Sequence, residues 1–393
     1  MRSPLLAGAA VFLLSAGGAR AAWDDWSLQP LTGELGDLNY SVGGQLQGSV
    51  FTANQPGTFS TTGGTGAAQL NARIERDYDS GLAIALKGQF ELFHDRLSSD
   101  NYGGDLVAKT YVSVQTGLGR IDVGMSDGAA YALAIVGPAV NGEVSIDNPN
   151  ATFFRDPSTG GRAFIDLFAL NSAVESSLNY DKISYYSPRL FGFQIAASFT
   201  PSEAKIVVPF ANNGPNVANR QRYLWEGAAN YSDSFGPITL GVYGGVTVGH
   251  NDTKTPGHAG LTDWAFGSEA DWNIDDDTKW SIGGAYRQAN TYAFDINNAL
   301  ASGATQSMHL SSVLSYGSWS IGGEFGNGAA DGAFGLPTLG MHAYMVDAAY
   351  AVNSNLQISG GWQRLNYHST ATFYNGLPRI EMDAFFLHAA LNI

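Results

Sequence analysis

Short segments in which apolar and polar residues alternate recur along almost the whole chain. In the segment of residues 39–51, one set of alternating positions is apolar: Tyr40, Val42, Leu46 and Val50. The positions between them include polar residues: Ser41, Gln45, Gln47 and Ser49. Successive side chains of a β-strand point to opposite faces, so each such segment predicts a strand with one apolar and one polar face.

Sixteen segments of this kind follow one another: 39–51, 68–75, 82–92, 106–116, 120–126, 182–187, 191–200, 222–231, 238–249, 263–272, 279–291, 305–316, 318–326, 342–352, 356–363 and 380–393. The connections between them alternate between short ones, such as 117–119, and long ones, such as 201–221. An even number of strands with short turns at one end and long loops at the other is typical of barrels that span an outer membrane. The sequence therefore predicts an all-β fold, a transmembrane antiparallel β-barrel of 16 strands. The alternative, a soluble β-sandwich, would place charge on the outer face, where this chain has Val, Leu, Phe, Tyr and Trp.

The first residues of the chain have the pattern of a secretion signal. Arg2 precedes an apolar run over residues 5–16, and Ala19 and Ala21 are small residues at the positions that a signal peptidase reads. We expect a signal peptide at residues 1–21, with cleavage after Ala21 and with Ala22 as the other choice. No linker divides the rest, so we expect residues 22–393 to form a single barrel domain.

One connection, residues 127–181, is far longer than the others. It contains apolar runs at 129–140 and 164–170, together with Phe153 and Phe154. Loops of this length in compact proteins are usually functional or disordered, and this one is too apolar to lie loose in water. We expect this third long loop to fold back into the lumen of the barrel.

Composition excludes several classes of function. The formal net charge of -15 argues against a nucleic-acid partner, because phosphate binding needs a basic surface. The chain has no cysteine, so no disulfide framework is available. The histidines lack the spacing of metal ligands, and we expect neither a metal nor a cofactor.

Three stretches resemble the trimeric general diffusion porins of Gram-negative outer membranes, and the resemblance extends from about Tyr40 to Ile393. The stretches are 78–82, 109–114 continued by 119–124, and 183–188 followed by 191–193. The resemblance implies a water-filled channel for passive diffusion of small hydrophilic solutes and ions. It also implies a place in the cell outer membrane of a Gram-negative bacterium, among membrane lipid and lipopolysaccharide, and a homotrimer in which residues 93–104 latch onto a neighbour.

The resemblance also implies where the channel is narrowest. In that family the third loop sets acidic residues against basic residues on the facing wall. By position, the basic wall residues are Arg73, Lys109 and Lys182, with Lys87 beside them, and the alternation independently points all four inward. The acids are drawn from five candidates in the loop: Asp127, Glu143, Asp147, Asp156 and Asp166. The acidic loop motif of the family is not recognisable here, so the choice among them stays open. Arg287 also faces inward by parity, and we expect it to be a solvated lining residue.

Two other functions remain to be weighed. His309 and Ser311 have the spacing of an outer-membrane phospholipase pair, but by parity both face the lumen, away from lipid, so we expect no enzyme. A substrate-selective channel, for instance for sugars, would line its path with aromatic residues. The inward aromatic residues form no evident ladder: Tyr111, Tyr186, Tyr243 and Phe386.

Overall fold

A computed structural model of the chain describes residues 28–55, 62–94, 107–148, 153–154, 170–202, 221–251, 258–292, 295–300, 303–331, 338–369 and 379–393. The expected signal peptide (residues 1–21) lies outside the described residues, as do Asp156 and Asp166. Within the described residues, no helix is long and apolar enough to cross a membrane.

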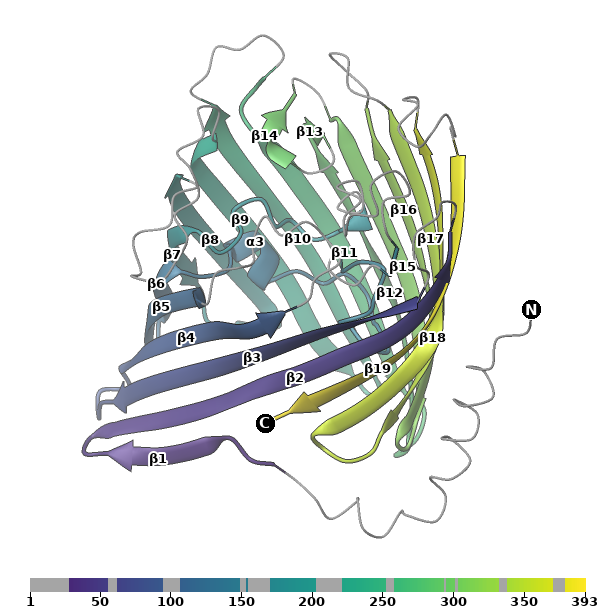
Figure 1. The fold of residues 1–393 in the computed structure, drawn as a ribbon. Coiled ribbons are helices and arrows are strands. Elements are labelled where there is room, and N and C mark those ends of the chain that lie inside the picture. The colour runs from purple at the N-terminus through teal and green to yellow at the C-terminus, as the bar shows by residue number, and fades with distance from the viewer. Residues whose placement is uncertain are drawn as a thin grey trace.

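Sixteen antiparallel strands in the described part of the chain form one closed ring, and they run obliquely around it (Figure 1). The strands of the first half are β2 (Leu38–Asn54), β3 (Thr62–Asp77), β4 (Ala83–His94), β5 (Val107–Thr116), β6 (Gly119–Met125), β7 (Asp181–Tyr186), β8 (Phe193–Ser202) and β9 (Gln221–Phe235). Those of the second half are β10 (Ile238–Asn251), β11 (Thr262–Asn273), β12 (Thr278–Ala289), β15 (Thr305–Tyr316), β16 (Trp319–Ala330), β17 (Leu339–Ala351), β18 (Leu356–Ser369) and β19 (Arg379–Asn392). The ring closes because β19 pairs with β2, where Phe386 lies opposite Phe51. The predicted fold class and strand number are confirmed.

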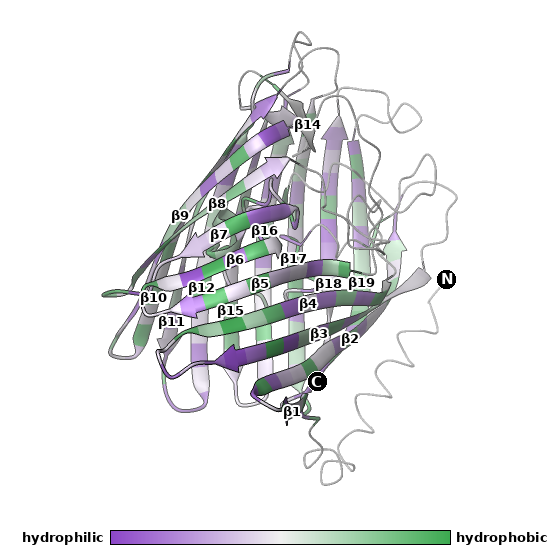
Figure 2. Ribbon diagram, turned by 90° about the vertical axis from the view of Figure 1, so that its left-hand side faces the viewer, coloured by the Kyte–Doolittle hydropathy of each residue, from purple (hydrophilic) through white to green (hydrophobic). Residues whose placement is uncertain are grey.

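Hydrophilic and hydrophobic residues alternate along the strands of the wall (Figure 2). On β2, Leu46 is 53% exposed and Val50 is 62% exposed, whereas Ser49 between them is 7% exposed. Outward-facing aromatic side chains gather near the two ends of the strands. Trp272 and Trp280, for example, lie beside a short turn. Closure of the ring pairs the backbone amides and carbonyls of the wall, which a structure in hydrocarbon requires.

A short strand that the alternation did not predict, β1 (Leu31–Leu35), lies at the seam of the barrel. It pairs with the first residues of β2 after a tight turn at Gly36, whose φ of 64° suits glycine. The side chain of Asn355 binds the backbone of Leu28 and also the carbonyl of Asn392. The N-terminal segment therefore continues the edge of β2 beyond the point where β19 ends. Five residues without clear alternation are too few for a pattern to reveal such a strand.

A second element that was not predicted is a small hairpin of β13 (Thr291–Tyr292) and β14 (Asp295–Ala299). It lies in a connection that the sequence pattern assigned to an irregular loop. Several wall strands are also longer than the alternating segments, as β3 shows by beginning at Thr62.

Candidate functional site

The first part of the long connection contacts the inner face of β8–β10. It contains the short helix α3 (Ala129–Ala132) (Figure 1). Tyr243 of β10 donates its hydroxyl to the Ala130 carbonyl at 2.7 Å, and Asn230 of β9 donates to the Leu133 carbonyl at 3.2 Å. Tyr243 is buried, whereas its neighbour Val242 faces outward and is exposed. The described start of this connection therefore lies inside the ring of strands.

The connection continues across the inner face toward β15, β16 and β2. His309 of β15 lies 2.8 Å from the carbonyl of Val136. Further along, Ser145 donates its hydroxyl to Glu324 of β16 at 2.7 Å. Gln47 of β2 donates to Glu143 at 3.1 Å. Contacts with well-separated strands hold this part of the connection along the wall.

An apolar cluster fills the space between the connection and β2 and β16–β19. The ring of Phe153 lies between those of Phe51 and Phe386, with centroid distances of 5.1 and 4.9 Å. The other cluster members from the connection are Val144, Ile146, Phe154 and Leu170. Those from the wall include Met341, Met345, Leu365, Ile380 and Met382. On this side of the barrel the inner face is apolar and covered.

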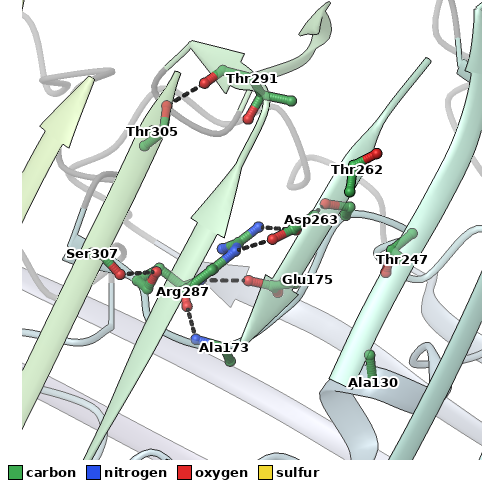
Figure 3. Close-up of polar contacts among 12 residues, drawn as sticks. Ala130, Ala173, Glu175, Thr247, Thr262, Asp263, Arg287, Thr291, Thr305 and Ser307 are labelled. Carbon is green, nitrogen blue, oxygen red and sulfur yellow. Dashed lines mark hydrogen bonds and ion pairs between the residues drawn. The ribbon is translucent and has the colours of Figure 1, made fainter. Parts of the chain in front are cut away.

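The returning part of the connection binds a buried ion pair that joins β11 and β12 (Figure 3). Arg287 donates from Nε and Nη2 to the two carboxylate oxygens of Asp263, at 2.9 and 2.7 Å, and both side chains are at most 3% exposed. Ser176 of the connection donates to the same carboxylate. Arg287 points inward as predicted, but it is covered by the connection and is not the solvated lining residue that we expected. Burial raises the pKa of the nearby Glu175 carboxyl, and the charge of Arg287 opposes that shift.

Lys182, one of the four basic wall candidates, lies beneath the base of the connection. Its Nζ donates to the carbonyls of Ser126 at 2.6 Å and Ser177 at 3.2 Å, and also to that of Leu178. The side chain is buried. The structure therefore places Lys182 beneath the connection, where it binds the two ends of the connection together.

The other basic candidates lie on neighbouring strands of the uncovered wall. Arg73 on β3 is directly opposite Lys87 on β4, and Arg73 forms an ion pair with Glu75. The ammonium of Lys87 lies 5.6 Å from the ring centre of Tyr111 on β5. Lys109, also on β5, is paired at 2.7 Å with Asp127, one of the acidic loop candidates.

The other acidic candidates are spread along the connection. Glu143 binds Gln47 of the wall, as described above. Asp147 accepts hydrogen bonds from the backbone and the hydroxyl of Ser172, at 2.8 and 2.5 Å, so it links two parts of the connection to each other. Burial raises the pKa of its carboxyl. Within the described residues, no group of three or more His, Asp or Glu side chains could hold a metal ion.

Sequence reasoning missed two charged residues on the inner face of β6, Arg120 and the buried Asp122. Arg120 pairs with Asp122 at 3.1 Å, and its guanidinium lies 4.2 Å from the ring centre of Tyr186. The alternation contained the signal, because Arg120 and Asp122 flank the exposed Ile121. They were not selected because the family resemblance did not point to them.

Comparisons with known proteins agree with this geometry. Residues 7–274, more than half of the chain, match the sequence profile of the Gram-negative porins. No curated protein matches the chain in sequence.

Solved porin structures resemble the barrel along their whole length. An anion-selective porin from Comamonas acidovorans superposes with a TM-score of 0.55 at 11% identity, over 91% of this chain and 100% of that chain. In-vitro folded OmpT, an outer membrane protein of Vibrio cholerae, superposes with a TM-score of 0.54 at 12% identity, over 92% of this chain and 99% of that chain. A mutant of Rh. blastica porin superposes with a TM-score of 0.51 at 14% identity, over 90% of this chain and 100% of that chain. At these identities the likeness establishes the fold, and the profile match establishes the family. The chain belongs to the Gram-negative porins and is an outer-membrane channel for diffusion.

Proposed function

We propose that small hydrophilic solutes and ions cross this channel passively through an off-centre bore, between the long connection and the wall formed by β3–β6. The observation that carries the proposal is the difference between the two sides of the inner face. The side chain of Arg73 on β3 is 50% exposed, whereas that of Arg287 on β12 is 3% exposed beneath the connection. Water and solutes therefore have access to the β3–β6 side.

The charges on this side define the field in the bore. Three basic groups of the wall are compensated by nearby acids, in the pairs Arg73–Glu75, Lys109–Asp127 and Arg120–Asp122. Lys87 has no ion-pair partner within the described residues. Opposed charges across a narrow passage orient dipolar solutes, and fixed charge selects among ions. The acidic composition of the chain favours cations overall, and Lys87 opposes this preference locally.

The inner face offers little support for a substrate-selective channel. Tyr186, Tyr243 and Phe386 are buried, and Tyr111 lies against Lys87, so these residues do not form an open aromatic path. An enzymatic role is not proposed either. The ring nitrogens of His309 face a carbonyl and a carboxylate, and Ser311 is buried.

The distribution of tryptophan supports a homotrimer. All the tryptophans of the described residues lie on β9, β11, β12, β16 and β18, and the strands from β19 through β2 to β8 have none. Tryptophan favours the interface between membrane and water, so its positions mark the arc that faces membrane lipid and lipopolysaccharide. The arc from β19 to β4 includes small outward-facing residues, such as Gly48 on β2 and Ala72, which pairs with Val42. This is the arc that we assign to contacts between subunits, after export directed by residues 1–21.

Two measurements test the proposal. Purified protein in planar bilayers should give stable, ohmic conductance, and liposomes containing it should swell with sugars up to a plain size limit. Saturable sugar flux would favour a binding site and a selective channel. Absence of conductance from correctly folded protein would rule the proposal out.

A further inference from the structure

A buried imidazole joins the long connection to the wall. His309 is 1% exposed; its Nδ1 lies 2.8 Å from the carbonyl oxygen of Val136, and its Nε2 lies 3.2 Å from Oε2 of Glu324. A carbonyl oxygen only accepts hydrogen bonds, so Nδ1 donates. A carboxylate also accepts, so Nε2 donates when Glu324 is ionised. The contacts on both sides therefore fit a ring that carries both protons, an imidazolium.

Glu324 is bound by the connection as well as by His309. The same Oε2 accepts from the hydroxyl of Ser145 at 2.7 Å and from the backbone N–H of Ile146 at 3.1 Å. A backbone N–H can only donate, and three donors around one oxygen fit an ionised carboxylate. One charged pair thus fixes the connection at Val136 on one side and at Ser145–Ile146 on the other.

The charged groups around this pair make it sensitive to protonation. Asp147 of the connection and Glu324 of β16 act electrostatically on His309, and Glu324 also acts on Asp347 of β17. Within the described residues, neither carboxylate oxygen of the buried Asp347 has a hydrogen-bond partner. The nearest buried cation of β12, Arg287, is already bound to Asp263. Two acids, Asp147 and Glu324, therefore act on one imidazolium in a site with little access to water, where an uncompensated charge is costly.

We infer that His309 and Glu324 form a proton-dependent clamp that positions residues 136–146 in the bore. The inference rests on the proposed function, in which this connection narrows the channel. When His309 loses its Nε2 proton at alkaline pH, a lone pair faces the Glu324 carboxylate and the attraction is lost. Loss of this attraction releases the connection from β15 and β16.

The test is the pH dependence of voltage-induced closure in planar bilayers. We expect the wild-type channel to close at a lower voltage above the pH at which His309 is deprotonated, because the released connection moves more readily in the field. His309→Gln has no titratable ring, so the alkaline transition should disappear. At every pH, the closing voltage of His309→Gln should equal that of the wild type at alkaline pH. The matched control is His388→Gln. His388 is buried on β19 with its Nδ1 2.8 Å from Ser49 Oγ, and no described contact joins it to the connection.

A second variant keeps the test decisive if His309→Gln does not fold. Glu324→Gln keeps an acceptor for Ser145 and Ile146 but removes the charge that stabilises the imidazolium, so the alkaline transition should move to lower pH. An alkaline transition unchanged in either folded variant overturns the clamp, as does its loss in His388→Gln. So does a conducting wild-type channel whose closing voltage does not change with pH. A wild-type protein without conductance would instead contradict the proposed function itself.

Discussion

Replacing Lys87 with glutamine tests where ions pass. Lys87 lies on the uncovered wall and has no ion-pair partner among the described residues, unlike Arg73 and Lys109. Its contact with the ring of Tyr111 does not neutralise the charge. Lys87→Gln should therefore increase the preference of the channel for cations over anions.

The size of the effect follows from the geometry of a narrow, water-filled bore. An ion that passes about 5 Å from a unit charge interacts with it by about 0.8 kcal/mol at the dielectric constant of water. Screening over a Debye length of about 10 Å reduces this to about 0.5 kcal/mol. Removing the charge then raises local cation concentration about twofold and lowers anion concentration about twofold, so the permeability ratio changes about fivefold or less.

The assay is the reversal potential of the channel in a KCl gradient. Arg76→Gln is a suitable control, because Arg76 lies near the end of β3 on the outer face, in an exposed pair with Asp37 at 2.9 Å. The control should keep the wild-type reversal potential. If Lys87→Gln conducts normally and its reversal potential equals that of the wild type, ions do not pass along β3–β6 and the proposed bore is wrong.

Four further variants probe how the connection is held, with stability measured as the heat-induced loss of the folded band in gel electrophoresis or as unfolding in urea. Arg287→Met should lower the free energy of unfolding by about 3–5 kcal/mol, because it leaves the Asp263 carboxylate buried without its partner. A decrease of less than about 1 kcal/mol, which is typical of an exposed ion pair, would contradict the burial. Lys182→Met should lower the free energy of unfolding by about 1–3 kcal/mol, since three carbonyls lose their hydrogen-bond donor. An unchanged urea midpoint would argue that Lys182 does not hold the ends of the connection. Phe153→Ala should increase single-channel conductance, because the connection loses its ring contacts with the wall; unchanged current noise and conductance would refute this. Glu175→Gln should stabilise the protein at neutral pH. The Glu175 pKa is raised in the folded state, so the ionised carboxyl destabilises the folded wild type as pH rises. The difference in stability between Glu175→Gln and the wild type should vanish below about pH 4, where the carboxyl is protonated in the unfolded state as well.

The strands could be predicted from sequence because two solvents impose the alternation. Lipid outside and water inside favour apolar and polar residues in turn, and this gave the strand number, the inward direction of Arg73 and Lys87, and the long connection. β1 escaped prediction because it lies at the seam, where its pairing depends on Asn355 and on the end of β19. No local pattern records such a contact between distant parts of the chain.

The site was harder to predict, because alternation reveals the face of a residue but not what covers it. Lys182, Arg287 and Lys87 all face inward by parity, yet two are buried beneath the connection and one lies on the uncovered wall. Their difference arises from tertiary packing of the described parts of the long connection. Only the apolar runs of that connection gave a sequence signal that part of the inner wall would be covered.

The same packing explains why the bore lies to one side. On β17 and β19 the inward positions include Met341, Met345 and Met382, so the inner face there is apolar. A wall that lines water would carry polar side chains at these positions. Apolar side chains in a water-filled lumen would be unfavourable unless something covered them, and Phe153 with its neighbours does so. The hydrophobic effect thus draws the connection onto one half of the wall, and its hydrogen bonds to the buried Asp263, His309 and Glu324 fix its position there. The polar, charged half between β3 and β6 is then left for water, so we propose that the apolar residues of the lumen determine where the channel is open.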